Sequence, residues 1–165
     1  MVVITFLLIA SCLIWAANVA CTVLSYWIPQ MLDASFVLFI AISIEWVLMF
    51  YLCHKNGMDN SLIKEETPKF FVILGVLSLI YTVGNTATSF LILSEGGPHI
   101  ENGVYYLWNH GFIREITREE YESLLLVESR FFSVLILAFS AAPMMIFSAI
   151  RERRFLLKHL ERTVE

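Results

Sequence analysis

Charged residues are scarce in this chain. Only 16% of its 165 residues are charged, and 58% are hydrophobic, whereas about a quarter of the residues in a soluble domain are charged. The scarcity excludes an ordinary soluble domain and predicts one integral membrane domain over residues 1–165. No Lys or Arg precedes Lys55. A secretory signal would begin with basic residues and be shorter, so we expect the first apolar run to be a retained spanning helix.

Cysteine pairs and catalytic motifs are also missing. Cys12, Cys21 and Cys53 lie in or beside apolar runs, so neither a disulfide framework nor a zinc site is expected. The chain contains no HExxH, CxxC or GxSxG motif and no glycine loop for phosphate. The sequence therefore predicts a protein that is not an enzyme, with no metal, no cofactor and no nucleic acid partner.

Long apolar runs are what the chain does have. They cover residues 2–27, 34–54, 70–93 and 131–150, and at ~1.5 Å per residue each is long enough to cross a bilayer core of ~30 Å. The third run carries small and polar residues along one helical face: Gly75, Ser78, Thr82, Asn85 and Ser89. Such a stripe lets helices approach closely and form hydrogen bonds. We therefore expect an all-α membrane protein, a four-helix transmembrane bundle with the third helix at its centre.

Local signals mark where these helices begin and end. Pro29 ends the first span, and Asp33 is placed to cap the second. Asn56-Gly57 ends the second span, and a polar loop is expected over residues 55–69. Thr67-Pro68 supplies an N-cap and a first-turn proline for the third span.

Residues 94–130 are predicted to lie outside the membrane, beginning with a small β-hairpin. Residues 104–108 form a strand-like run, residues 109–111 have turn chemistry, and the chain can return over residues 112–116. The hairpin would carry an aromatic group: Tyr105, Tyr106, Trp108, His110 and Phe112. This group is either a partner-binding surface or an anchor on lipid headgroups.

A helix follows the hairpin and leads into the fourth span. Thr117 and Glu120 form a capping box, the first turns are amphipathic, and Pro143 should kink the span. The basic tail, residues 151–165, is expected to continue as a helix at the membrane surface. Lys and Arg also concentrate in the loop 55–69, so both termini and this loop are predicted to be cytoplasmic and the hairpin external.

Glu45 lies near the middle of an apolar run. A charged carboxylate there costs about 2.5–3.5 kcal/mol, so it should face the bundle or be protonated. Helical rise places a polar cluster near the midpoints of the four spans: Asn18, Glu45, Asn85 and Ser140. The cluster is either a proton or cation relay, a point of partner recognition, or a neutral group that fixes helix register.

One stretch resembles known proteins. Residues 102–133, with Asn-His-Gly at 109–111, Ile-Arg-Glu-Ile-Thr at 113–117 and Arg130, look similar to the external segment of small uncharacterised inner-membrane proteins of bacteria. This resemblance implies the bacterial inner membrane and no known activity. The four-span layout is also similar to that of immunity proteins for pore-forming toxins.

Together these features predict a non-enzymatic interaction protein of the bacterial inner membrane. It would be an immunity-type inhibitor or an accessory subunit, and its partners would be the lipid bilayer and another membrane protein, a toxin or a second copy. The alternative is a small oligomeric transporter or channel, coupled to protons or cations, that uses Glu45.

Overall fold

Helices make up most of this chain in the computed structural model, which describes residues 2–28, 31–109 and 112–164. The elements in order are α1 (Val2–Leu24), α2 (Met31–Lys55), α3 (Asn60–Glu66), α4 (Lys69–Leu93), β1 (Gly97–Glu101), β2 (Val104–Asn109), β3 (Phe112–Glu115) and α5 (Arg118–Val164). Among the described residues, α1, α2, α4 and α5 are long and apolar enough to cross a membrane. Their outer surfaces are strongly apolar, as the exposed Phe6, Val47 and Leu91 illustrate.

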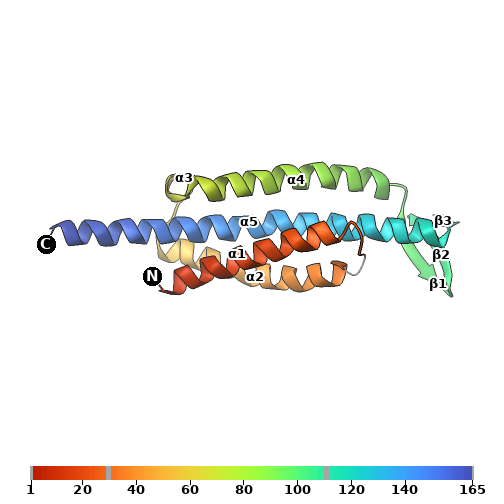
Figure 1. The fold of residues 1–165 in the computed structure, drawn as a ribbon, viewed down its shortest axis with the longest axis horizontal. Helices are drawn as coiled ribbons and strands as arrows, with labels where there is room; N and C mark the ends of the chain where they lie inside the picture. Colours follow the sequence, from red (N-terminus) through yellow and green to blue (C-terminus); the bar gives the residue numbers. More distant parts are fainter. Residues whose placement is uncertain (1, 29–30, 110–111, 165) are drawn as a thin grey trace.

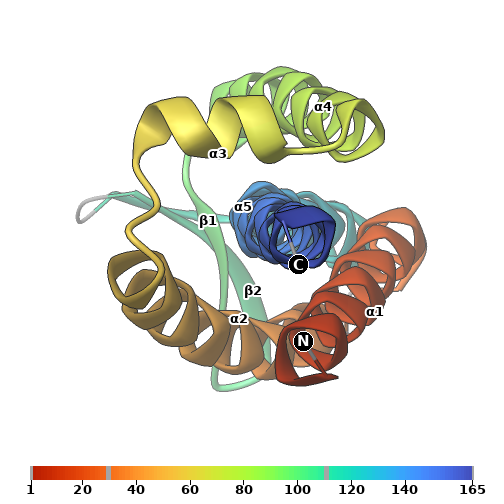
Figure 2. The ribbon, with the colours of Figure 1, turned by 90° about the vertical axis from the view of Figure 1, so that its left-hand side faces the viewer.

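The helix α5 is the axis of the structure (Figures 1 and 2). The other three long helices each pack against α5, and α1 also packs against α2, whereas no extensive packing joins α4 to α1 or α2. The expectation that residues 70–93 form the central helix is therefore wrong. A stripe of small residues covers one face of a helix, as in α4, but a central helix needs small or buried residues on every side. Such residues occur around α5, including Ser133, Ser140, Ala141 and Ala149.

The two ends of the structure differ. Both chain ends and α3 lie at one end, and the sheet lies at the other (Figure 1). At the end with α3, the Arg154 guanidinium donates to Asn56 Oδ1 at 2.7 and 3.0 Å, and Arg153 donates to the Gly57 carbonyl at 3.2 Å. Gly57 has φ 58°, and the Met58 amide donates to the Cys53 carbonyl at 3.0 Å. This Schellman motif confirms that Asn56-Gly57 ends α2.

Two of the expected caps are wrong, and one helix was not expected. Asp33 lies within the first turn of α2, which begins at Met31. Thr67 does not cap α4, because its hydroxyl donates back to the Ile63 carbonyl at 2.5 Å. The loop 55–69 contains α3, whose first turn is held by Asp59: its carboxylate accepts from the Leu62 amide at 2.9 Å. An acidic residue before a run of helix formers was the available signal.

The sheet has three antiparallel strands in the order β1-β2-β3. The predicted hairpin is confirmed as β2 and β3, and β1 is an additional strand that pairs with β2. Asn102 (φ 50°) and Gly103 (φ 80°) connect β1 to β2. Positive φ at both positions is the type I′ turn that Asn-Gly favours, so this dipeptide was the signal for the missed strand.

The helix α5 contains 47 residues and is therefore about 70 Å long. Its start is confirmed, because the Glu120 amide donates to Thr117 Oγ1 at 3.1 Å. The predicted union of the amphipathic segment, the fourth span and the basic tail is also confirmed, and the tail continues beyond α1 and α4 (Figure 1). The sharp kink expected at Pro143 is absent: in both views α5 follows one nearly straight path.

Candidate functional site

Glu45 is buried, with 5% of its surface exposed, and it lies in the middle of α2. Ser11 on α1 donates to Glu45 Oε1 at 2.7 Å. The other oxygen, Oε2, is buried without a partner among the described residues. One hydrogen bond from a hydroxyl offsets only a small part of the cost of burying a charged carboxylate, so burial disfavours the charged form of Glu45. The arrangement can hold a proton on Oε2.

The other members of the predicted polar cluster have different partners. Asn18 donates to the Ile14 carbonyl at 3.0 Å, and Ser140 donates to the Leu137 carbonyl at 2.8 Å, so both bonds stay within one helix. Asn85 instead accepts from the Tyr26 hydroxyl at 3.1 Å. Within the described ranges no hydrogen bond joins any two of the four residues. Ser11, which is not a member of the predicted cluster, is the residue that meets Glu45.

A layer of hydroxyl groups joins all four long helices. Ser35 Oγ on α2 lies 2.7 Å from Ser133 Oγ on α5, and Thr22 on α1 donates to the Ser133 carbonyl at 3.4 Å. Thr82 on α4 donates to the Val134 carbonyl at 3.0 Å. We call these residues the hydroxyl layer. Each of these hydroxyl residues interrupts an apolar run, and this is the sequence signal that predicts a polar contact between helices. Sequence spacing alone does not show which group on α5 each hydroxyl contacts.

The predicted stripe on α4 lies partly against α5. Ser78, Thr82 and Ser89 are buried, and a Cβ atom at Gly75 would collide with Met145 Sδ. Asn85 is only half-buried and contacts Tyr26, which follows the end of α1. Ser78 accepts a hydrogen bond from Trp15 Nε1 at 3.1 Å, so the stripe also serves a contact to α1.

A cross-helix hydrogen bond lies beside Pro143. Proline has no amide proton, so the carbonyl four residues earlier, that of Phe139, lacks its usual partner. Trp46 on α2 donates its Nε1–H to this carbonyl at 3.1 Å. The indole ring also meets the Phe139 ring edge-on at 6.2 Å. The proline thereby creates a polar attachment point on α5 for α2.

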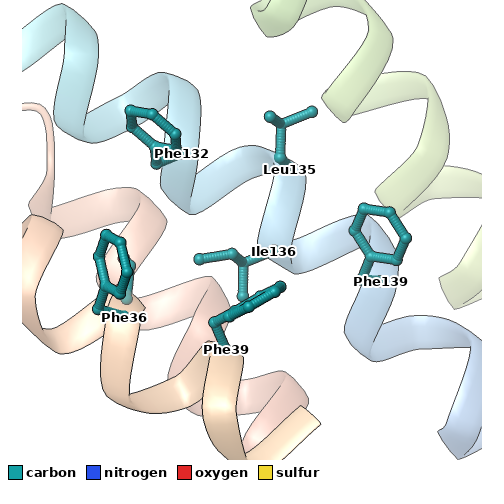
Figure 3. A pocket seen from close by; sticks show the side chains of 7 residues that line it. Phe36, Phe39, Phe132, Leu135, Ile136 and Phe139 are labelled. Carbon is teal, nitrogen blue, oxygen red and sulfur yellow. The ribbon is translucent and has the colours of Figure 1, made fainter. Parts of the chain in front are cut away.

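A phenylalanine-lined groove runs between α2 and α5. We call it the α2–α5 groove, and Figure 3 shows its side chains. Its lining residues are Ser35, Phe36 and Phe39 from α2 and Phe132, Leu135, Ile136 and Phe139 from α5. Ile136 is buried, whereas Phe36 and Phe139 are more than half exposed. A second hollow continues the groove past Phe139 to Trp46.

The aromatic residues of the hairpin do not share one surface. Tyr105 packs on Tyr121 of α5, with ring centroids 4.8 Å apart, and Leu107 on the same side of β2 is buried. Strand alternation places Tyr106 and Trp108 on the other side, where 52% of Trp108 is exposed. His110 and the side chain of Phe112 lie outside the described residues.

Polar contacts fix the sheet to the helices. Arg114 on β3 pairs with Glu120 on α5 at 2.6 Å, and this hydrogen bond raises the pKa of the Arg114 guanidinium. Asn109 on β2 donates to the Ser94 carbonyl at 3.2 Å. The exposed ion pair adds little stability, so its main effect is to orient β3 against the start of α5.

Among residues 2–28, 31–109 and 112–164 no three His, Cys, Asp or Glu side chains are grouped to hold a metal ion. The three cysteines are free and half-buried. No family model, curated protein or solved structure matches this chain. Glu45, the α2–α5 groove and the outer face of the sheet are among the features of the described residues that can serve a function.

Proposed function

We propose that this chain is a non-enzymatic interaction protein of a membrane, in which α5 and the helices around it form a four-helix transmembrane bundle. It acts as an immunity-type inhibitor or as an accessory subunit, bound to another membrane protein. In this proposal both termini are cytoplasmic, the sheet is external, and the membrane is the inner membrane of a bacterium. The observation that carries the proposal is the α2–α5 groove.

The shape of the groove fits a partner helix. Along α2 the groove and its continuation extend from Ser35 to Trp46, which is ~16 Å of helix or about three turns. In lipid, apolar surface alone drives no association, so helices join where their shapes allow close packing. A concave face between exposed phenylalanine rings provides such a shape. The occupant we propose is one transmembrane helix of the partner, with small residues on the side that enters.

The outer face of the sheet adds a second contact. Trp108 is exposed, and Tyr106 lies on the same side of β2. Rigid aromatic side chains are enriched at the centres of protein interfaces. The sheet also lies at the N-terminal end of α5 (Figure 1), and Phe132 is the groove residue on α5 that is nearest to that end in the sequence. A partner with one spanning helix and one external segment can therefore contact both features.

The test is affinity purification of the full chain from its native membrane in mild detergent, followed by identification of any stoichiometric partner. Leu135→Trp fills the groove and should release the partner. Leu79→Trp is the matched control, because Leu79 is 56% exposed on α4 and lies outside the groove. Trp108→Ala should weaken the complex, whereas Trp27→Ala, also an exposed tryptophan, should not. Purification of the chain alone, or equal retention by Leu135→Trp and its control, would contradict the proposal.

A second candidate is a small oligomeric transporter or channel coupled to protons or cations. The observation that favours it is the unpartnered Oε2 of Glu45, because a carboxyl group that can gain and lose a proton inside a membrane is the minimum for coupling. Glu45→Gln keeps the size of the side chain and the Ser11 bond but cannot titrate. A transporter would lose proton-coupled flux in proteoliposomes at normal expression. The interaction protein should keep its partner.

A further inference from the structure

A second apolar cleft lies between α1 and α4, on another side of α5 from the α2–α5 groove. Three helices contribute its walls, and we call it the α1–α4 cleft. Its principal lining residues are Trp15, Val19, Leu74, Leu77, Tyr81 and Leu137. The hydrogen bond from Trp15 to Ser78, at 3.1 Å, lies toward the end of the cleft that is nearer the middle of α1.

Polar and aromatic groups gather at the other end. The Tyr26 hydroxyl donates to Asn85 Oδ1 at 3.1 Å and lies 3.2 Å from the Tyr81 hydroxyl. Because the Tyr26 proton is directed to Asn85, Tyr81 is the donor in the second bond. The Arg130 guanidinium lies over the Tyr26 ring, 4.3 Å from its centroid. Helical spacing aligns these groups with the cleft, since Arg130 is two turns before Leu137 on the same face of α5.

Arg130 has no anionic partner in the described part of the chain. The ion pairs found there use Arg114 and Arg118, and Arg130 Nε is buried without a hydrogen-bond acceptor. Stacking on Tyr26 offsets only part of the cost of holding a cation beside apolar surface. Arg130 is partly exposed, so the two terminal nitrogens of its guanidinium, rather than the buried Nε, are the donors open to an external anion.

The cleft covers most of one membrane leaflet. Its lining residues on α1, from Trp15 to Val23, extend along ~12 Å of the helix, and half of a ~30 Å hydrocarbon core is about 15 Å. Trp15 lies in the middle of α1 (Val2–Leu24) and so at the level of the bilayer centre. Arg130 then lies at the headgroup level, where phosphate groups are found.

We infer that this end of the molecule binds one anionic phospholipid. Its phosphate contacts the Arg130 guanidinium, whose parallel N–H groups match two phosphate oxygens, and one acyl chain occupies the α1–α4 cleft. Tyr26 and Tyr81 lie between headgroup and chain, as amphipathic aromatics do at membrane interfaces. This inference uses a different face from the α2–α5 groove and does not depend on the proposed function.

Native mass spectrometry of the purified full chain tests the inference. Dioleoyl-phosphatidylglycerol and dioleoyl-phosphatidylcholine are added at equal concentration, and the retained adducts are compared. We expect at least a fivefold preference for the anionic lipid. Arg130→Gln should abolish the preference and Arg130→Lys should keep part of it. Arg118→Gln is the control for charge, because Arg118 is exposed and paired with Glu122. Equal retention of both lipids, or no effect of Arg130→Gln, overturns the inference.

The role of the acyl chain needs separate variants. Val19→Phe fills the cleft and should lower retention of phosphatidylglycerol several-fold. Leu77→Trp provides the same test where Val19→Phe does not fold, because Leu77 is 57% exposed. Millimolar inorganic phosphate should not displace the lipid, and complete displacement would show a free-anion site instead. If both cleft variants instead dissociate a dimer and leave lipid retention unchanged, the cleft holds a second copy and the inference is wrong.

Discussion

Trp46→Phe is the most informative single change in α2. The indole Nε1–H donates to the Phe139 carbonyl, which Pro143 leaves without an intrahelical donor. In water such a carbonyl would be hydrated, but in lipid no replacement donor exists. Phenylalanine preserves most of the ring contact and removes only the donor, so the loss should be specific to the membrane-embedded protein.

A double-mutant cycle with Pro143→Ala isolates the hydrogen bond. Hydrogen bonds between membrane helices measure ~0.6 kcal/mol on average and reach ~1.7. We expect Trp46→Phe to cost about 1 kcal/mol more with proline at 143 than with alanine, because the alanine amide supplies the missing donor. Packing lost with the smaller ring is common to both backgrounds and cancels in the difference.

Unfolding by dodecyl sulfate in mixed lipid micelles, followed by circular dichroism, measures the four free energies. Trp15→Phe is the control, because the Trp15 indole donates to Ser78 on α4 and not to the Phe139 carbonyl. Its effect should be additive with that of Pro143→Ala. If Trp46→Phe costs the same in both backgrounds within about 0.3 kcal/mol, the carbonyl beside the proline is not the group that the tryptophan satisfies.

Three further perturbations test other parts of the fold. Gly96 has φ 142°, and a Cβ atom there would meet a backbone oxygen of β2 at 2.8 Å, whereas nothing lies within 4 Å of a Cβ at Gly97. Gly96→Ala should therefore lower the free energy of unfolding by about 1–3 kcal/mol. Gly97→Ala should lower it by much less in the same unfolding assay. Ser35→Ala breaks the hydroxyl layer and should cost about 0.5–1.5 kcal/mol, but Ser43→Ala, whose hydroxyl bonds only its own helix, should be nearly neutral. The first amide hydrogen bonds of α3 hold the pKa of the Asp59 carboxyl below its usual range, so this cap stabilises α3 above pH ~4 and is lost as the pH falls through the lowered value. The protection of the α3 amides from hydrogen exchange should therefore fall between pH 6 and pH 3. In the Asp59→Asn variant this pH-dependent loss of protection should be absent, since asparagine caps a helix without titrating.

The long helices and the hairpin were predictable because each rests on local physics. An uncharged run of spanning length has one favourable state in a bilayer, and Thr117 with Glu120 defines a helix start. The strand β1 was missed because Pro98 and the glycines before it are typical of the end of a helix rather than of a strand. The Asn102-Gly103 dipeptide, which favours a hairpin turn, was the signal for this strand. The central helix was misassigned because the stripe on α4 is conspicuous in sequence, while the small residues of α5 are spread around its circumference.

The polar contacts were less predictable than the helices. Position along a span is computed from helical rise, and Glu45 does lie near the middle of α2. The choice between Asn18 and Ser11 as its partner depends on how α1 is rotated about its axis, which apolar residues on all sides do not specify. The same holds for Thr22 and Ser35, whose partners on α5 are more than ninety residues away in sequence.

The position of α5 also has a consequence for biosynthesis. Ribosomes add about 5–20 residues per second, so the 71 residues from the end of α4 at Leu93 to the end of α5 at Val164 take roughly 4–14 s to make. During that interval α1, α2 and α4 lack the helix against which they pack, and the hydroxyls of Thr22, Ser35 and Thr82 lack their partners on α5. The newly inserted chain is therefore a recognisable substrate for membrane chaperones and proteases until α5 enters. Any truncation before α5 should leave it in that state and shorten its lifetime in the cell.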